Sequence, residues 1–139
     1  MTPFQRMLAG TPLAQAMQLH QVAGALEAPF APSRNQLDVA FGGAMAAGMA
    51  LAGWVFVAEH AEAVLDDAQN PLLAGATQRF FKPFVDPTLR FQVDPVDQSV
   101  MDAWAARWRA NQRVRAPLVA RVVDRQGDTF AEAELNFVL

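Results

Sequence analysis

The sequence predicts an α+β fold in which an antiparallel sheet of about five strands wraps around one long central helix. The first observation is the run of residues 39–58, which contains no charged side chain and is rich in alanine and glycine. A helix that is apolar on every side is buried on every side. The second is that short segments with strand-like alternation lie before and after this run. A sheet that surrounds the helix buries both kinds of element in one core.

Two short helices are expected at the N-terminus. Thr2-Pro3 combines a helix-capping residue with proline at the first helical position, and this helix should end near Gly10. Thr11-Pro12 repeats the signal and predicts a second helical turn that reaches about Met17. Residues 18–28 then alternate between apolar and polar side chains, which predicts the first strand. Residues 29–34 form a loop.

The central helix is predicted over residues 41–65, and Asn70-Pro71 marks the turn that follows it. Strands are expected over residues 73–84 and 88–96, separated by Asp86-Pro87. Residues 114–125 and 129–138 form the last two strands, a hairpin around Gln126-Gly127-Asp128.

Residues 97–112 form a helix in this prediction because Met101, Trp104 and Trp108 recur at spacings of three and four. A strand is the alternative for this segment.

Composition excludes several classes of function. The net charge of −3 argues against nucleic-acid binding. Without cysteine the chain has no disulfide, thiol nucleophile or thiolate metal site. The two histidines, His20 and His60, have no carboxylate motif around them, so no metal site is expected. We therefore expect a single cytoplasmic domain over residues 1–139, without a signal peptide and without a metal or redox cofactor.

The uncharged run is also long enough to cross a membrane. However, it contains four glycines, its downstream flank is acidic, and no basic cluster sets an orientation. The central-helix interpretation therefore explains the run better, and we expect no membrane partner.

Gly42 and Gly43 stand where the central helix begins. The first amides of a helix have no partner within the helix, so they can hold a developing negative charge on a substrate oxygen. Glycine leaves the approach to these amides open. The alternative is that the two glycines only permit close contact between helix and sheet.

Residues 35–43, Asn-Gln-Leu-Asp-Val-Ala-Phe-Gly-Gly, resemble the Asn-x-x-Gly-x-x-Phe-Gly-Gly signature of hotdog-fold acyl-CoA thioesterases. Gly53-Trp54 and the segment Phe80-Phe81-Lys82-Pro83 are similar to two further motifs of the type called YiiD C-terminal. The resemblance covers essentially the whole chain. It departs from the pattern at three positions, where Asp38, Val39 and Ala44 replace the expected Gly, Thr and Ser.

The resemblance implies a hotdog fold and a hydrolase that acts on acyl-CoA or acyl-carrier-protein thioesters. Coenzyme A would enter only as part of the substrate. In this hypothesis Gly42 and Gly43 polarise the thioester carbonyl, Asn35 positions the attacking water, and Asp38 is the candidate base. Asn35 and Asp38 have a structural alternative, as a loop or cap residue and as a carboxylate that stabilises the helix start.

Substrate contacts are assigned to Phe41, Trp54, Phe81 and Lys82. Aromatic side chains on strands and on a central helix are also typical of an ordinary core. Six of the eleven basic residues fall within residues 107–125, where they form either a patch for the phosphates of coenzyme A or a solvated face. We expect a homodimer or a dimer of dimers, since hotdog sheets normally pair edge to edge.

The central helix lacks the acid that many hotdog thioesterases carry about two turns after the glycines. Glu59 is its first carboxylate and lies roughly 24 Å from Gly43, which is too far for the same site. Acids from a partner subunit are open alternatives: Asp86, Glu132 or Glu134. The missing acid and Ala44 favour a second hypothesis, a module that binds acyl groups without cleaving them.

Overall fold

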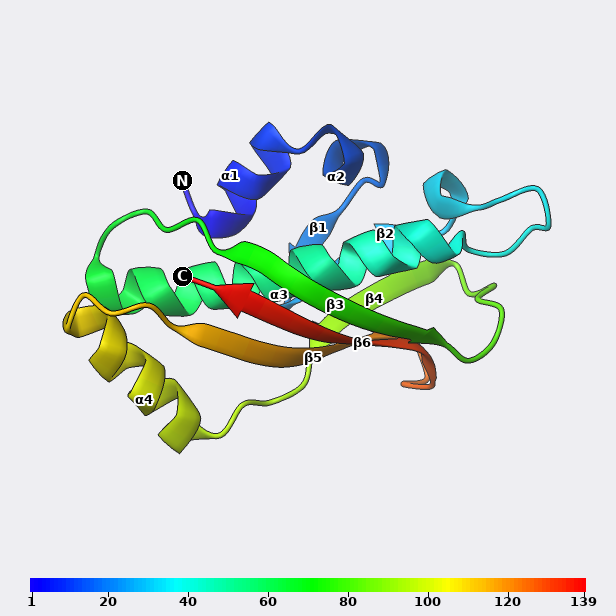
Figure 1. Ribbon diagram of the computed structural model, residues 1–139. Helices are drawn as coiled ribbons and strands as arrows, with labels where there is room; N and C mark the ends of the chain where they lie inside the picture. The colour runs from blue at the N-terminus through cyan, green and yellow to red at the C-terminus, as the bar shows by residue number, and fades with distance from the viewer.

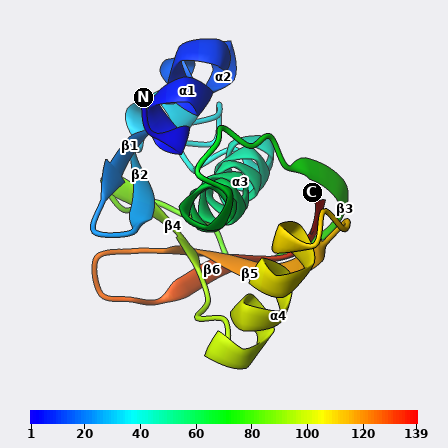
Figure 2. The same ribbon diagram turned by 90° about the vertical axis from the view of Figure 1, so that its left-hand side faces the viewer.

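The computed structural model describes all 139 residues. Six strands form one sheet in the order β1-β2-β4-β5-β6-β3, in which all neighbouring strands are antiparallel. The sheet curves around the central helix α3, Gly42–Leu65 (Figures 1 and 2). The predicted architecture is therefore confirmed, with six strands rather than about five.

The additional strand arises from the predicted strand over residues 18–28, which is a hairpin of β1, His20–Val22, and β2, Ala25–Pro29. Ala23 and Gly24 form the turn between them, and both adopt positive φ angles, 46° and 79°. Such a turn reverses the chain over two residues. The alternating pattern continues through the turn, so it does not reveal the break.

The remaining elements are close to the predicted ones. They are α1 (Pro3–Gly10), α2 (Pro12–Ala16), the 3-10 turn η1 (Ala31–Ser33), β3 (Leu72–Phe80), β4 (Thr88–Val93), α4 (Gln98–Arg109), β5 (Arg115–Val123) and β6 (Thr129–Val138). The helix within residues 97–112 is confirmed, and its strand alternative is wrong. β3 and β4 end before Pro83 and Pro95, because proline cannot donate to a ladder and disfavours the interior of a sheet.

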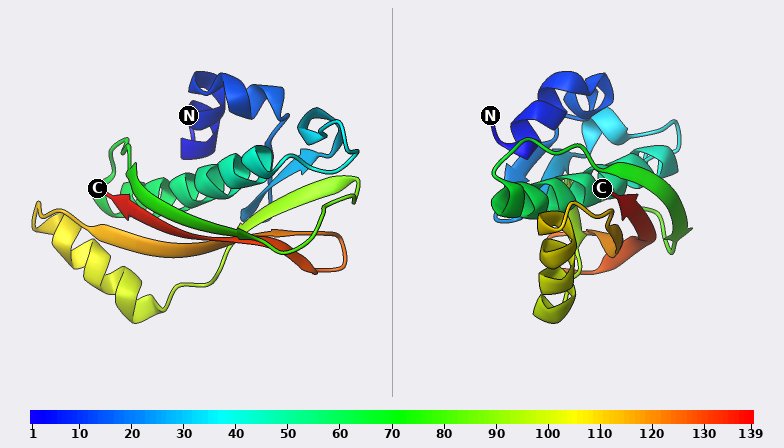
Figure 3. Two further views of the ribbon diagram at one scale, coloured as in Figure 1. Left: turned by 45° about the vertical axis from the view of Figure 1, so that its right-hand side comes forward. Right: turned by 60° about the vertical axis from the view of Figure 1, so that its left-hand side comes forward.

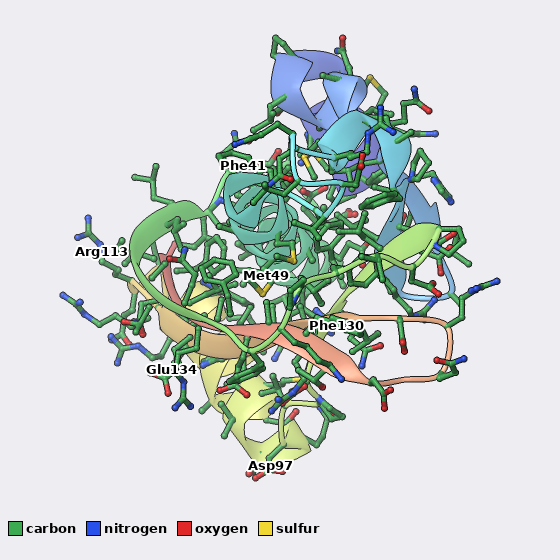
Figure 4. All side chains as sticks on the ribbon, turned by 90° about the vertical axis from the view of Figure 1, so that its right-hand side faces the viewer. Phe41, Met49, Asp97, Arg113, Phe130 and Glu134 are labelled. Carbon is green, nitrogen blue, oxygen red and sulfur yellow. The ribbon has the colours of Figure 1, made fainter.

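α3 is the core helix of the domain. Its Met49 is fully buried and lies between the helix and the sheet (Figure 4). A Cβ on Gly48 would stand 2.2 Å from the buried Phe91 ring, and one on Gly53 would stand 2.7 Å from Phe137. The glycines therefore let the sheet approach the helix backbone closely. α3 has the length and composition of a membrane span, yet half of its most apolar window is buried inside the protein.

The two N-terminal helices lie over the side of α3 that faces away from the sheet (Figure 3). α1 is fixed there by Arg6, whose guanidinium donates to the Glu62 carboxylate at 3.1 Å and to the Gln69 carbonyl at 3.3 Å. The hydrogen bond from Arg6 lowers the pKa of Glu62. Glu62 is thereby part of the contact between α1 and α3.

β3 is an edge strand and is exposed over nearly its whole length. Just beyond it, the Phe81 N–H donates to the Phe130 carbonyl of the facing residue. Hydrogen-bonded pairs alternate along an antiparallel ladder, so the Thr77 N–H also points toward β6. The Gln78 N–H then points away from β6, to the free edge of the sheet.

Candidate functional site

The start of α3 leaves two amides without an acceptor. Phe41 is the N-cap, with φ −64° and ψ 131°, and its side chain cannot accept a hydrogen bond. Its carbonyl accepts from the N–H groups of Ala44 and Met45 at 3.0 and 3.1 Å. The N–H groups of Gly42 and Gly43 bond to no protein atom. They are free to bind an acceptor from outside the chain, in the positive field of the helix end.

Two backbone hydrogen bonds fix the loop that leads into the helix. The Phe41 N–H donates to the Ser33 carbonyl at 2.7 Å, and the Ala40 N–H donates to the Phe84 carbonyl at 2.9 Å. The first bond holds η1 against the residue that precedes the glycine doublet. The second ties the same loop to the segment between β3 and β4.

Asn35 organises this loop. Its side-chain oxygen accepts from the N–H of Leu37 at 2.9 Å and from that of Val39 at 3.4 Å. Both acceptor positions of the oxygen are thus used, while the side-chain NH₂ has no protein partner. Asn35 therefore has the role of a loop residue that was expected as its alternative. The Asn35 side chain therefore offers a ligand only its NH₂ donor, which can hold the oxygen of a water or of a carbonyl.

Asp38 lies at the tip of the loop, with φ 58° and 83% of its side chain exposed. One carboxylate oxygen stands 3.7 Å from the Arg34 guanidinium. A left-handed backbone is the conformation that glycine adopts most readily, which accounts for the glycine that the resemblance leads one to expect here. The same conformation directs the carboxylate into solvent.

A pocket of about 330 Å³ opens beside the helix start. α2 forms one wall, η1 and Asn35 form another, and the beginning of α3 completes it. Its lining residues are Leu13, Ala16, Met17, Pro32, Ser33, Arg34, Asn35, Phe41, Gly43 and Ala44. Three of the predicted site residues, Asn35, Phe41 and Gly43, therefore share one pocket. No carboxylate lines it.

Phe41 covers part of this pocket. Its ring packs on the α-carbon of Gly43, so that a Cβ on Gly43 would stand 2.3 Å from the ring. The ring is nevertheless more than half exposed, and Figure 4 shows it at the N-terminal end of α3. A Cβ on Gly42 would meet a different side chain, the Phe80 ring, at 3.8 Å.

The other predicted substrate contacts lie elsewhere in this chain. Trp54 follows Gly43 by eleven residues, or about 16 Å along the helix. It lines a separate pocket of about 440 Å³, and its indole N–H donates to the Pro71 carbonyl at 2.9 Å. Phe81 is exposed just after β3, and the Lys82 ammonium lies 4.5 Å from the centre of the Phe130 ring.

Sequence reasoning missed one residue near the helix start, Ser33. The order of the predicted elements put its loop close to the helix, but no motif singled out its side chain. Phe80 is the residue beside Gly42, whereas the motif-based assignment chose the neighbouring Phe81.

Most of the alternative acids are engaged in ion pairs. The Arg125 guanidinium bonds to Asp86 at 3.0 Å and lowers its pKa. Arg121 bonds to Asp94 at 2.9 Å and also to Glu132. Two arginines of the predicted basic patch are thereby neutralised, and two of the three proposed partner acids are occupied. Glu134 is exposed and forms no ion pair.

The part of the patch that forms no ion pair lies around the end of α4, where the Arg107 guanidinium donates to the Arg113 carbonyl. Arg107, Arg113 and Arg115 line a pocket of about 360 Å³ together with Trp104 and Val114. Arg115 pairs with Val138 at the start of β5, so this cluster lies at the end of the sheet opposite to Phe80 and the helix start. Within one chain it cannot reach the pocket at Gly43.

No protein-family model and no curated protein matches the sequence. Solved structures do match. A protein of Shewanella oneidensis, provisionally described as a thioesterase, superposes with a TM-score of 0.77 at 20% identity, over 97% of this chain and 92% of that one. The BH2602 protein of Bacillus halodurans, solved with coenzyme A, gives 0.71 at 24% identity, over 97% and 80%.

The PaaI protein of E. coli, from a phenylacetic acid degradation operon, gives a TM-score of 0.67 at 13% identity, over 97% of this chain and 88% of that one. Identities this low establish the fold. The predicted hotdog fold is therefore confirmed, and the structural neighbours are proteins of the hotdog thioesterase superfamily. The narrower resemblance to the YiiD C-terminal type stays a prediction.

Proposed function

We propose that this hotdog domain hydrolyses acyl thioesters of coenzyme A or of an acyl carrier protein. The observation that carries the proposal is the pair of unpartnered amides, Gly42 and Gly43, at the start of the buried helix beside a pocket. The names of the structural neighbours, and the coenzyme A bound by one of them, support the same substrate class.

In this mechanism the thioester carbonyl oxygen accepts hydrogen bonds from the two glycine amides. Water adds to the carbonyl carbon, the oxygen becomes an oxyanion, and the amides stabilise that charge. The carbon–sulfur bond then breaks, and the sulfur leaves as a thiol with a proton that came from the water. The NH₂ of Asn35 holds the water oxygen at the pocket.

Asp38 is the proposed base that takes the proton of the water. It is the carboxylate of the loop that forms the pocket, although its side chain points to solvent beside Arg34. Asp38 can act as the base only if this loop rotates and brings the carboxylate to the pocket when substrate binds. A general base contributes about 10²- to 10⁴-fold, so Asp38→Asn should lower kcat by at least about 100-fold.

A second function has a specific observation in its favour. Because no carboxylate lines the pocket, the same donors can hold an acyl thioester without activating water. This is the non-catalytic binding module.

Thiol release from a panel of acyl-CoA thioesters separates the two functions. We expect steady-state hydrolysis by the wild type, and a loss of at least tenfold in Asn35→Asp. That variant keeps the oxygen that accepts from the loop amides and loses the NH₂ donor. Binding of acyl-CoA in calorimetry without thiol release would instead select the binding module. An unchanged rate in Asp38→Asn would remove only the base assignment.

We propose further that two chains pair through the free edges of β3. Antiparallel pairing places the Leu72 end of one strand beside the Phe80 end of its partner. The cluster of Arg107, Arg113 and Arg115 would then lie toward the helix start of the other chain, on the side where coenzyme A carries its phosphates. Arginine is well suited to phosphate because its planar fork donates two parallel hydrogen bonds.

A further inference from the structure

Ser33 has a buried hydroxyl without a hydrogen-bond partner. The residue is only 3% exposed, and its Oγ bonds to no atom of the protein. Leaving a buried hydroxyl unpaired costs about 1–3 kcal/mol, so an unpaired one in a native protein has a reason, such as a bound ligand or an ordered water. The backbone of Ser33 is fully used, since its carbonyl accepts from Phe41 and its N–H donates to the Phe30 carbonyl at 3.0 Å.

The position of Ser33 suggests that reason. It lines the same pocket as Gly43 and Asn35. The hydrogen bond of 2.7 Å between the Ser33 carbonyl and the Phe41 N–H fastens it to the residue immediately before the glycine doublet. Three residues that line the pocket thus carry a donor without a protein acceptor: the Gly43 N–H, the Asn35 NH₂ and the buried Ser33 O–H. A pocket rich in unused donors and without a carboxylate is suited to an oxygen that carries negative charge.

We infer that the Ser33 hydroxyl donates a hydrogen bond to the carbonyl oxygen of the bound acyl thioester, beside the amides of Gly42 and Gly43. This inference rests on the proposed function, because it takes an acyl carbonyl as the ligand of the pocket. Ser33 acts as a donor and forms no covalent bond. The apolar wall of Leu13, Ala16 and Met17 would face the acyl chain.

The test compares two coenzyme A analogues that cannot be hydrolysed. One carries a ketone one carbon away from the sulfur, and the other is the matching alkyl thioether without the carbonyl. Calorimetry gives the preference of each protein for the ketone. We expect the wild type to prefer the ketone and Ser33→Ala to lose about five- to tenfold of this preference, the value of one hydrogen bond. Ser33→Cys, a weaker donor of similar size, should fall between them.

Thermal unfolding distinguishes the proposed role of the Ser33 hydroxyl from a purely structural one. Ser33→Ala removes an unpaired buried hydroxyl, so its melting temperature should equal or exceed that of the wild type. A serine that stabilised the loop through its hydroxyl would give a lower one. Ser99→Ala is the matched control, because Ser99 is exposed on α4 and should change neither quantity.

The outcomes separate this inference from the proposed function. If the wild type releases no thiol but prefers the ketone, and Ser33→Ala loses the preference, hydrolysis is wrong and the role of Ser33 stands. If the wild type hydrolyses acyl-CoA and Ser33→Ala keeps both kcat and the ketone preference, the role of Ser33 is overturned and hydrolysis stands. Equal binding of the two analogues by the wild type also overturns the role of Ser33.

Discussion

Gly42→Pro is expected to lower kcat for acyl-CoA hydrolysis by about 10²- to 10³-fold, the usual effect of removing one oxyanion donor. Proline has no N–H, so the variant deletes one of the two donors and leaves the rest of the site unchanged. The fold should tolerate it, because Gly42 is the first helical residue and its N–H has no protein partner to lose. Phe41 already has the extended backbone that a residue before proline requires.

The thermal stability of Gly42→Pro separates the loss of an oxyanion donor from a loss of the fold. A proline in a compatible backbone stabilises a protein by about 0.4–1 kcal/mol, so Gly42→Pro should melt at the same or a higher temperature than the wild type. Gly42→Ala is the matched variant: it keeps the N–H, and its Cβ would meet only the Phe80 ring at 3.8 Å. It should lose far less activity. Equal activity in a folded Gly42→Pro protein would contradict the assignment of this amide.

Gln78→Pro is expected to convert the proposed β3-paired dimer to a folded monomer. The N–H of Gln78 points to the free edge of β3, so proline there blocks pairing with a second chain and leaves the bonds to β6 intact. Sedimentation over a range of protein concentrations should show the dissociation constant raised by at least 100-fold, with little change in thermal stability.

Thr77→Pro is the control for this prediction. The N–H of Thr77 points toward the Glu134 carbonyl of β6, so its loss should lower the stability of the chain itself. If Gln78→Pro and wild type associate equally, β3 is not the interface. The proposed route by which Arg113 and Arg115 reach the partner's substrate would then be wrong as well.

The helix and its entry could be predicted because their signals are local. An uncharged run indicates a buried helix. The glycine doublet marks the start of that helix, at two residues that carry no side chain. The hairpin of β1 and β2 could not be predicted, since Ala23 gives no sign of the left-handed backbone that breaks the strand.

The site was predicted less completely because it is formed by tertiary contacts. Asp38 is adjacent to the helix in sequence, but its positive φ directs the carboxylate away. Trp54 belongs to the same helix as Gly43 and yet lies in another pocket. Ser33 enters the site through a backbone hydrogen bond to Phe41, and nothing in the composition of the loop indicates that bond.

The most direct measurement follows the glycine amides themselves by nuclear magnetic resonance. Protein labelled with ¹⁵N only at glycine carries eight such residues, and the ketone analogue of acyl-CoA supplies the carbonyl. We predict that the amide proton signals of Gly42 and Gly43 move downfield on binding, while those of Gly75 and Gly127 stay in place. Saturable binding of the analogue with the Gly42 and Gly43 signals unmoved would contradict the account.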